Sequence, residues 1–86
     1  MKLDLTQVTT KEALMTWLKE SFSFPEYFGA NWDAVAECLL DTCTEDVTIE
    51  IVNEGAATDE MKLEMAILRN VVEEFNVPGG VHIMIV

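Results

Sequence analysis

The most informative stretch of this chain is residues 24–41, which read FPEYFGANWDAVAECLLD. Its first part is predicted to be an aromatic loop, because Pro25 fixes φ and Gly29 tolerates positive φ, and both residues resist a regular helix. A helix should begin after Asn31, whose side-chain oxygen can accept hydrogen bonds from free backbone N–H groups of the first turn. The stretch therefore predicts a loop that leads directly into a capped helix.

Two stripes are predicted on this helix. Residues spaced i, i+3, i+4, i+7 and i+8 share one helical face and predict a surface that faces the core. The apolar members of this series are Trp32, Val35, Ala36, Leu39 and Leu40. Beside them, three carboxylates repeat every four residues, at Asp33, Glu37 and Asp41. Like charges at this spacing destabilise a helix by roughly 0.2–0.5 kcal/mol per pair, so the acidic row is either a solvated face in an acidic chain or a contact surface.

The loop and the start of the helix resemble the signature of the barstar family, the small intracellular inhibitors of secreted microbial ribonucleases. The resemblance is carried without gaps by residues 24–29, 31–34 and 38–39. It implies the barstar fold and an inhibitor. Two positions depart from the family pattern: Glu37 stands where the family's most important contact is an aspartate, and Ala36 stands where the family often has a tryptophan.

The resemblance also implies, position by position, which residues contact the partner. They are Tyr27, Gly29, Asn31, Trp32, Asp33, Glu37 and Glu73. Glu74 is the alternative to Glu73, because the register of the match is loose in that region. The implied partner is a basic protein, a microbial ribonuclease. The two departures leave open a different ribonuclease, or a toxin of another class with a basic cleft.

The rest of the chain predicts three strands and two further helices. Alternating or continuous apolar residues predict strands within residues 1–5, 47–52 and 81–86. Thr9 and Glu12 predict a capping box for a helix that ends between residues 21 and 25. Thr58 is predicted to cap a long helix that residues 78–80 terminate. The expected core stripes of these two helices are Leu14, Trp17, Leu18 and Phe22, and Met61, Met65, Leu68, Val72 and Phe75, widened by Ile67 and Val71.

This order of elements predicts a two-layer α/β domain over residues 1–86. Connections much longer than a hairpin join parallel strands through right-handed crossovers. The alternation in residues 47–52 predicts one covered and one wet face. We therefore expect a three-stranded parallel sheet with the helices packed on one face. The strand order stays open, although the continuous apolar character of residues 81–86 favours a well-covered position for the last strand.

The charge balance restricts the partners. Five Lys and Arg against 16 Asp and Glu give a formal net charge of −11, which repels nucleic acid and anionic membranes and attracts basic surfaces.

No apolar run approaches the ~20 residues of a membrane span, and the N-terminus lacks a signal-peptide core. We expect a cytoplasmic protein that is monomeric when free. Cys38 and Cys43 fit neither a zinc nor a redox motif, and cytosolic thiols stay reduced.

The sequence contains no recognisable catalytic motif. A GxGxxG loop, a P-loop, an HExxH motif and a nucleophile elbow are all absent, and His82 has no catalytic partner nearby in the sequence. We therefore expect no enzyme activity, no cofactor and no metal centre. The favoured function is an inhibitor of a ribonuclease, whose cationic site accepts carboxylates. Two less favoured alternatives stay open: an acidic structural or regulatory interaction domain, and a carboxylate cluster that binds Ca²⁺ or Mg²⁺.

Overall fold

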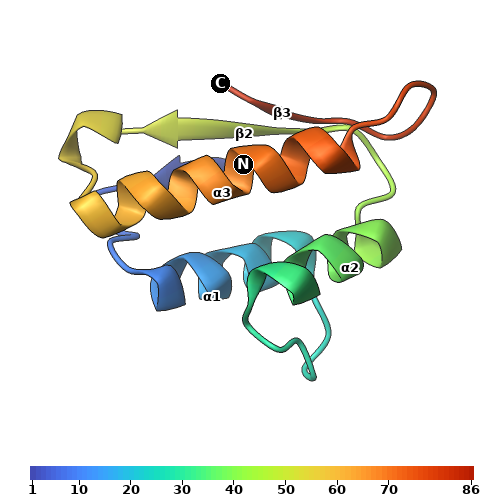
Figure 1. Ribbon diagram of the computed structural model, residues 1–86, viewed down its shortest axis with the longest axis horizontal. Coiled ribbons are helices and arrows are strands. Elements are labelled where there is room, and N and C mark those ends of the chain that lie inside the picture. The colour runs from blue at the N-terminus through green and yellow to red at the C-terminus, as the bar shows by residue number, and fades with distance from the viewer.

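The computed structural model describes all of residues 1–86, which form three strands and three α-helices (Figure 1). The strands are β1 (Lys2–Asp4), β2 (Val47–Val52) and β3 (Ile83–Ile85). The helices are α1 (Lys11–Phe22), α2 (Trp32–Thr42) and α3 (Asp59–Phe75), and a short 3₁₀ helix, η1 (Glu54–Ala56), precedes α3. Both strand pairs are parallel. The predicted α/β class and the parallel sheet are confirmed.

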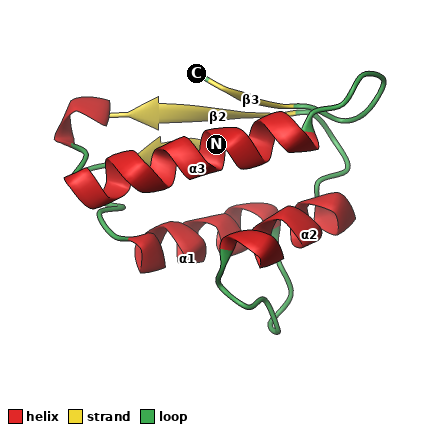
Figure 2. Cartoon of the chain, viewed as in Figure 1, coloured by secondary structure: helices red, strands yellow, loops and turns green.

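The strand order is β1-β2-β3, so β2 is the central strand. The chain steps in the same direction across the sheet at both crossovers, and right-handed crossovers then place all helices on one face, as Figure 2 shows. The prediction that the last strand is well covered was wrong, because β3 lies at the edge. Its apolar residues alternate between faces: Ile83 is buried, whereas Met84 points away from the helices and is 61% exposed.

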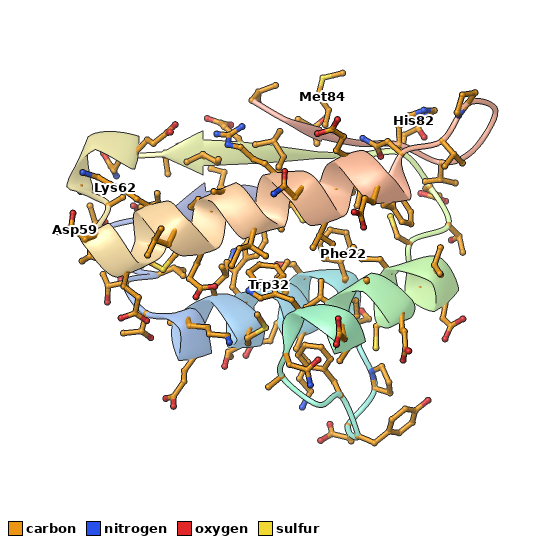
Figure 3. All side chains as sticks on the ribbon, viewed as in Figure 1. Phe22, Trp32, Asp59, Lys62, His82 and Met84 are labelled. Carbon is orange, nitrogen blue, oxygen red and sulfur yellow. The ribbon has the colours of Figure 1, made fainter.

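The core lies between the sheet and the helices, and it contains no polar side chain. The buried residues of α1 are Leu14, Met15, Leu18 and Phe22, and those of α3 are Met61, Met65, Leu68 and Val72. Phe22 and Trp32, labelled in Figure 3, lie between α3 and the helices α1 and α2. The predicted stripes are largely confirmed, but Ile67, which was expected to widen the stripe of α3, is exposed. Trp17 is the exception on α1: it is only half-buried, and its indole N–H donates to the carbonyl oxygen of Lys2 at 3.0 Å.

The predicted core stripe of α2 was too wide. Val35 and Leu39 are buried and Trp32 is half-buried, but Ala36 is exposed and Leu40 is 73% exposed. The reason is tertiary, because α2 packs mainly against the neighbouring helices α1 and α3. Only a narrow strip of its surface therefore meets the core, and the remaining apolar side chains face solvent.

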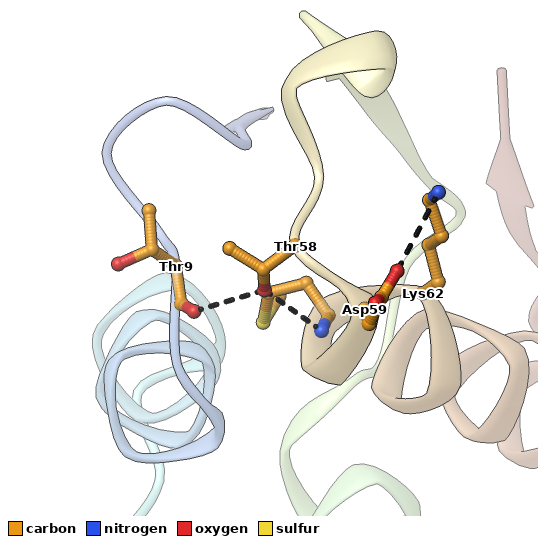
Figure 4. A network of polar contacts seen from close by, with 5 residues as sticks. Thr9, Thr58, Asp59 and Lys62 are labelled. Atoms are coloured by element: carbon orange, nitrogen blue, oxygen red, sulfur yellow. Dashed lines mark hydrogen bonds and ion pairs between the residues drawn. The ribbon is translucent and has the colours of Figure 1, made fainter.

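The helix caps are local features that were mostly predicted. Asn31 caps α2 and accepts a hydrogen bond from the N–H of Ala34 at 2.8 Å, and Thr58 caps α3. The capping box at Thr9 was wrong, because Thr10 is the cap of α1 and Glu12 then lies one residue short of the required position. The carbonyl oxygen of Thr9 instead accepts a hydrogen bond from the Thr58 hydroxyl at 3.4 Å (Figure 4).

Candidate functional site

The loop before α2 is held at its base and exposed at its tip. Phe24 is buried, and the centroid of its ring lies 5.9 Å from the ring centroid of Phe22 and 4.9 Å from that of Phe28. Tyr27, at the tip, is 86% exposed. Ala30 has φ 52°, a left-handed conformation that costs a residue with a Cβ roughly 1–2 kcal/mol. The aromatic base thus anchors a strained loop that presents Tyr27 to solvent.

Two of the predicted contact residues shape the junction between the loop and α2. Asn31 caps the helix through its side-chain oxygen, and its Nδ2 donates to the carbonyl oxygen of Gly29 at 3.3 Å. A Cβ on Gly29 would lie 3.1 Å from that Nδ2, which is tighter than ordinary van der Waals contact. Asn31 therefore ties the first turn of α2 to the loop, and the absence of a Cβ at Gly29 leaves room for its side chain.

Trp32, another predicted contact residue, connects α2 to α3. Its indole Nε1 donates to Glu64 Oε2 at 2.8 Å, and the ring is half-buried (Figure 3). Sequence reasoning did not identify Glu64. The signal for it was the helical spacing of Glu64, Val71 and Glu74, which places these three residues along one edge of α3. This edge of α3 faces α2.

The acidic row of α2 is fully available to a partner. Asp33, Glu37 and Asp41 are all exposed. The chain's three ion pairs are Lys19–Glu26, Lys62–Asp59 and Arg69–Glu54. None of them includes a residue of the row. With a rise of 1.5 Å per residue, successive carboxylates are attached about 6 Å apart along the helix. Because no ion pair involves them, the row carries three uncompensated negative charges.

A hollow of about 280 Å³ lies between this row and the aromatic loop. It is lined by Ser23, Pro25, Tyr27, Glu37, Cys38, Asp41 and Thr42. The structure thus brings the exposed phenol of Tyr27 and two carboxylates of the row around one concave surface. Such a surface offers a hydrogen-bonding hydroxyl and two negative charges to a cationic group that enters it.

The negative charges of the row act on the thiol of Cys38, which lies in the same hollow. Burial raises the pKa of the Cys38 thiol, and the negative charges of Asp41 and Glu37 raise that pKa further. Burial also raises the pKa of Cys43, which is buried at the end of α2. Both cysteines are free thiols, and their raised pKa values keep them protonated at neutral pH.

The two glutamates considered on α3 lie on different sides of that helix. Glu74 lines a hollow of about 180 Å³ together with Ala36 and Leu40 of α2. Glu73 lines a different hollow, which it shares with His82 and Met84 beside β3. The structure therefore brings Glu74, the alternative residue, next to α2, and places Glu73 toward the edge of the sheet.

No group of three or more His, Cys, Asp and Glu side chains lies close enough together to hold a metal ion. His82 is exposed, and its backbone N–H donates to Asp46 Oδ1 at 2.8 Å. None of the helices is long and apolar enough to cross a membrane.

Comparison with known proteins gives one clear result. A search of curated proteins finds no match. The family model described as Barstar (barnase inhibitor) matches residues 1–80 of the 86. This match includes the aromatic loop, the acidic row and the whole of α3, and it extends far beyond half of the chain. The chain belongs to the barstar family.

Proposed function

We propose that this protein is a barstar-like immunity protein that binds a ribonuclease toxin and occludes its basic active site with the acidic edge of α2. Family membership supports a role as a ribonuclease inhibitor and not as an enzyme. The observation that carries the proposed mode of binding is the acidic row. Asp33, Glu37 and Asp41 are exposed and unpaired, although their mutual repulsion destabilises the helix that carries them.

The chemistry of a ribonuclease explains why such a row would bind. Its active site holds phosphate and stabilises developing negative charge, which requires cationic donors such as Lys, Arg and His. Carboxylates on a helix edge can occupy the places of the phosphates and form charge-assisted hydrogen bonds. Complementary charge also accelerates the encounter, and the barnase–barstar pair is itself the standard example of this steering.

The proposed contact residues fall into two groups, those that are exposed and those that also hold the loop and α2 in place. Tyr27, Asp33 and Glu37 are exposed and would touch the partner. Gly29, Asn31 and Trp32 also hold the loop and α2 in place in the free protein, in addition to the contacts that we propose for them. On α3 we now favour Glu74 over Glu73, because Glu74 shares a hollow with α2.

The same hollow bears on which toxin is recognised. Ala36, Leu40, Val71 and Phe75 give it apolar walls, and Glu74 adds one carboxylate. Ala36 leaves this space open beside the acidic row, and Glu37 reaches one methylene farther than an aspartate would. Both features favour a target that differs from the usual ribonuclease of the family. A toxin of another class with a basic cleft is therefore the second candidate.

The proposal is tested by titrating the protein into assays of a panel of basic microbial ribonucleases and of the partner captured from the source cells. We expect the activity of the cognate enzyme to fall linearly to zero at one equivalent. The variant Asp33→Asn/Glu37→Gln/Asp41→Asn keeps the shape of the row without its charge and should inhibit far less. If activity persists at excess protein across the panel and the captured partner, the protein is not a ribonuclease inhibitor.

A further inference from the structure

The outer edge of β3 carries main-chain groups that β2 does not use. His82 and Val86 bond to β2, since Val47 N–H donates to His82 O at 3.1 Å and Ile51 N–H donates to Val86 O at 3.0 Å. Alternate residues of a strand direct their main-chain groups to opposite sides. Ile83 and Ile85 therefore direct theirs outward, where an exposed edge can serve as a template for another strand.

Asn76 occupies this edge at Ile83. Its Nδ2 donates to the carbonyl oxygen of Ile83 at 2.7 Å, and the N–H of Ile83 donates to Asn76 Oδ1, also at 2.7 Å. A carboxamide has the same donor and acceptor as a peptide group. The side chain of Asn76 thus makes both hydrogen bonds that a neighbouring strand would make at this residue, whereas the main-chain groups of Ile85 are left without a strand beside them.

The surroundings of this edge suit a second copy of the same chain. A hollow of about 530 Å³ lies along the edge, and the exposed side chain of Met84 adds apolar surface. Two copies of one edge strand pair antiparallel about a two-fold axis, so the pattern of free groups is self-complementary. Arg69 and Glu73 both line the hollow, one helical turn apart, and a two-fold axis can place each beside the opposite charge of the other copy. The ion pair of Arg69 with Glu54 is exposed and 3.8 Å long, so Arg69 is free to change partner.

We infer that the β3 edge is a latent strand-pairing surface for a second copy of this chain, and that Asn76 keeps it closed. This surface is separate from the acidic row, because it lies on the side of α3 that carries Glu73. In Figure 3, His82 and Met84 mark this edge, well away from Trp32. The closed edge leaves the free protein monomeric.

The first test uses amide hydrogen exchange of the intact wild-type protein. The amide of Ile83 should be protected at least about tenfold more than that of Ile85, because only Ile83 has a hydrogen-bond partner at the edge. Equal exchange at the two amides would show that Asn76 does not close the edge and would overturn the inference.

The second test is sedimentation velocity over a concentration series, at about 0.5 M salt to screen the repulsion between copies. Asn76→Ala should self-associate about tenfold or more tightly than wild type, since it frees the two main-chain groups of Ile83. Asn70→Ala is the matched control, because Asn70 is exposed on α3, and it should behave as wild type. Adding Ile85→Pro to Asn76→Ala should abolish the association, because proline removes an outward N–H from the edge.

Two results of sedimentation would refute the inference: a folded Asn76→Ala that stays as monomeric as wild type, or an association that survives Ile85→Pro. If Asn76→Ala does not fold, Asn76→Gln is measured by the same criteria. Its longer side chain keeps the amide but cannot make both bonds in the same geometry, so it should also self-associate.

Discussion

Replacing Glu37 by alanine separates function from stability at one residue. Glu37 lies in the middle of α2, four residues from both Asp33 and Asp41. Its side chain is exposed and makes no hydrogen bond or ion pair, so truncating it takes away no favourable contact in the free protein. The substitution removes two repulsive pairs of roughly 0.2–0.5 kcal/mol each, and the higher helix propensity of alanine adds a few tenths more. The free protein should therefore become more stable by about 0.5–1.5 kcal/mol.

The complex should respond in the opposite direction. Without Glu37, cationic groups of the toxin would be buried without their counter-charge, which costs on the order of 2–5 kcal/mol. At about 1.4 kcal/mol per tenfold change, affinity should fall roughly 30-fold to several thousand-fold. Denaturant unfolding and titration with the partner measure both effects on the same sample.

Glu20→Ala is the matched control, because Glu20 is an exposed glutamate on α1 and its loss changes the net charge by the same amount. This variant should bind almost as wild type does. If Glu37→Ala is less stable than wild type and still binds normally, Glu37 is a structural residue, and the contact surface does not lie on the acidic row.

Three further results are expected. Trp32→Phe should destabilise the protein by about 1–2 kcal/mol in denaturant unfolding, because the hydrogen bond to Glu64 is lost, and Glu64→Gln should then have little additional effect; full additivity would contradict the coupling. Hydrogen bonds from Asn53 and Thr6 hold the pKa of Asp4 below its usual value. The stability that Asp4 contributes is therefore present above about pH 3.9 and is lost as the pH falls through the lower folded-state pKa. The stability difference between wild type and Asp4→Asn should accordingly shrink in acid, and a constant difference would contradict the assignment. In stopped-flow mixing with the partner, salt should slow association much more than it accelerates dissociation, because the steering charges are screened over ~10 Å at 0.1 M; an association rate indifferent to salt would exclude steering.

The features that could be predicted from the sequence are those with a local physical cause. Asn31 and Thr58 cap their helices with their own side chains, and β2 was located by alternation within its own six residues. The acidic row follows from the helical period alone. The aromatic loop carries the resemblance that led to the family.

The features that could not be predicted depend on how distant elements meet. Leu40 fits the apolar period of α2, but it is exposed because α2 meets its neighbours along a narrow strip. Thr9 and Thr10 both fit the rules for a cap, and only the folded chain distinguishes them. The choice between Glu73 and Glu74 depends on which side of α3 faces α2, and the strand order likewise depends on long-range packing.

Competition with a mononucleotide tests most directly whether the acidic row enters the active site of the toxin. The dissociation constant of the complex is measured at increasing concentrations of a mononucleotide that occupies the active site of the cognate ribonuclease. If the row binds there, the apparent dissociation constant should rise in proportion to one plus the ratio of the mononucleotide concentration to its own dissociation constant. An apparent dissociation constant that does not change at saturating mononucleotide would show that the protein binds elsewhere and would contradict the account.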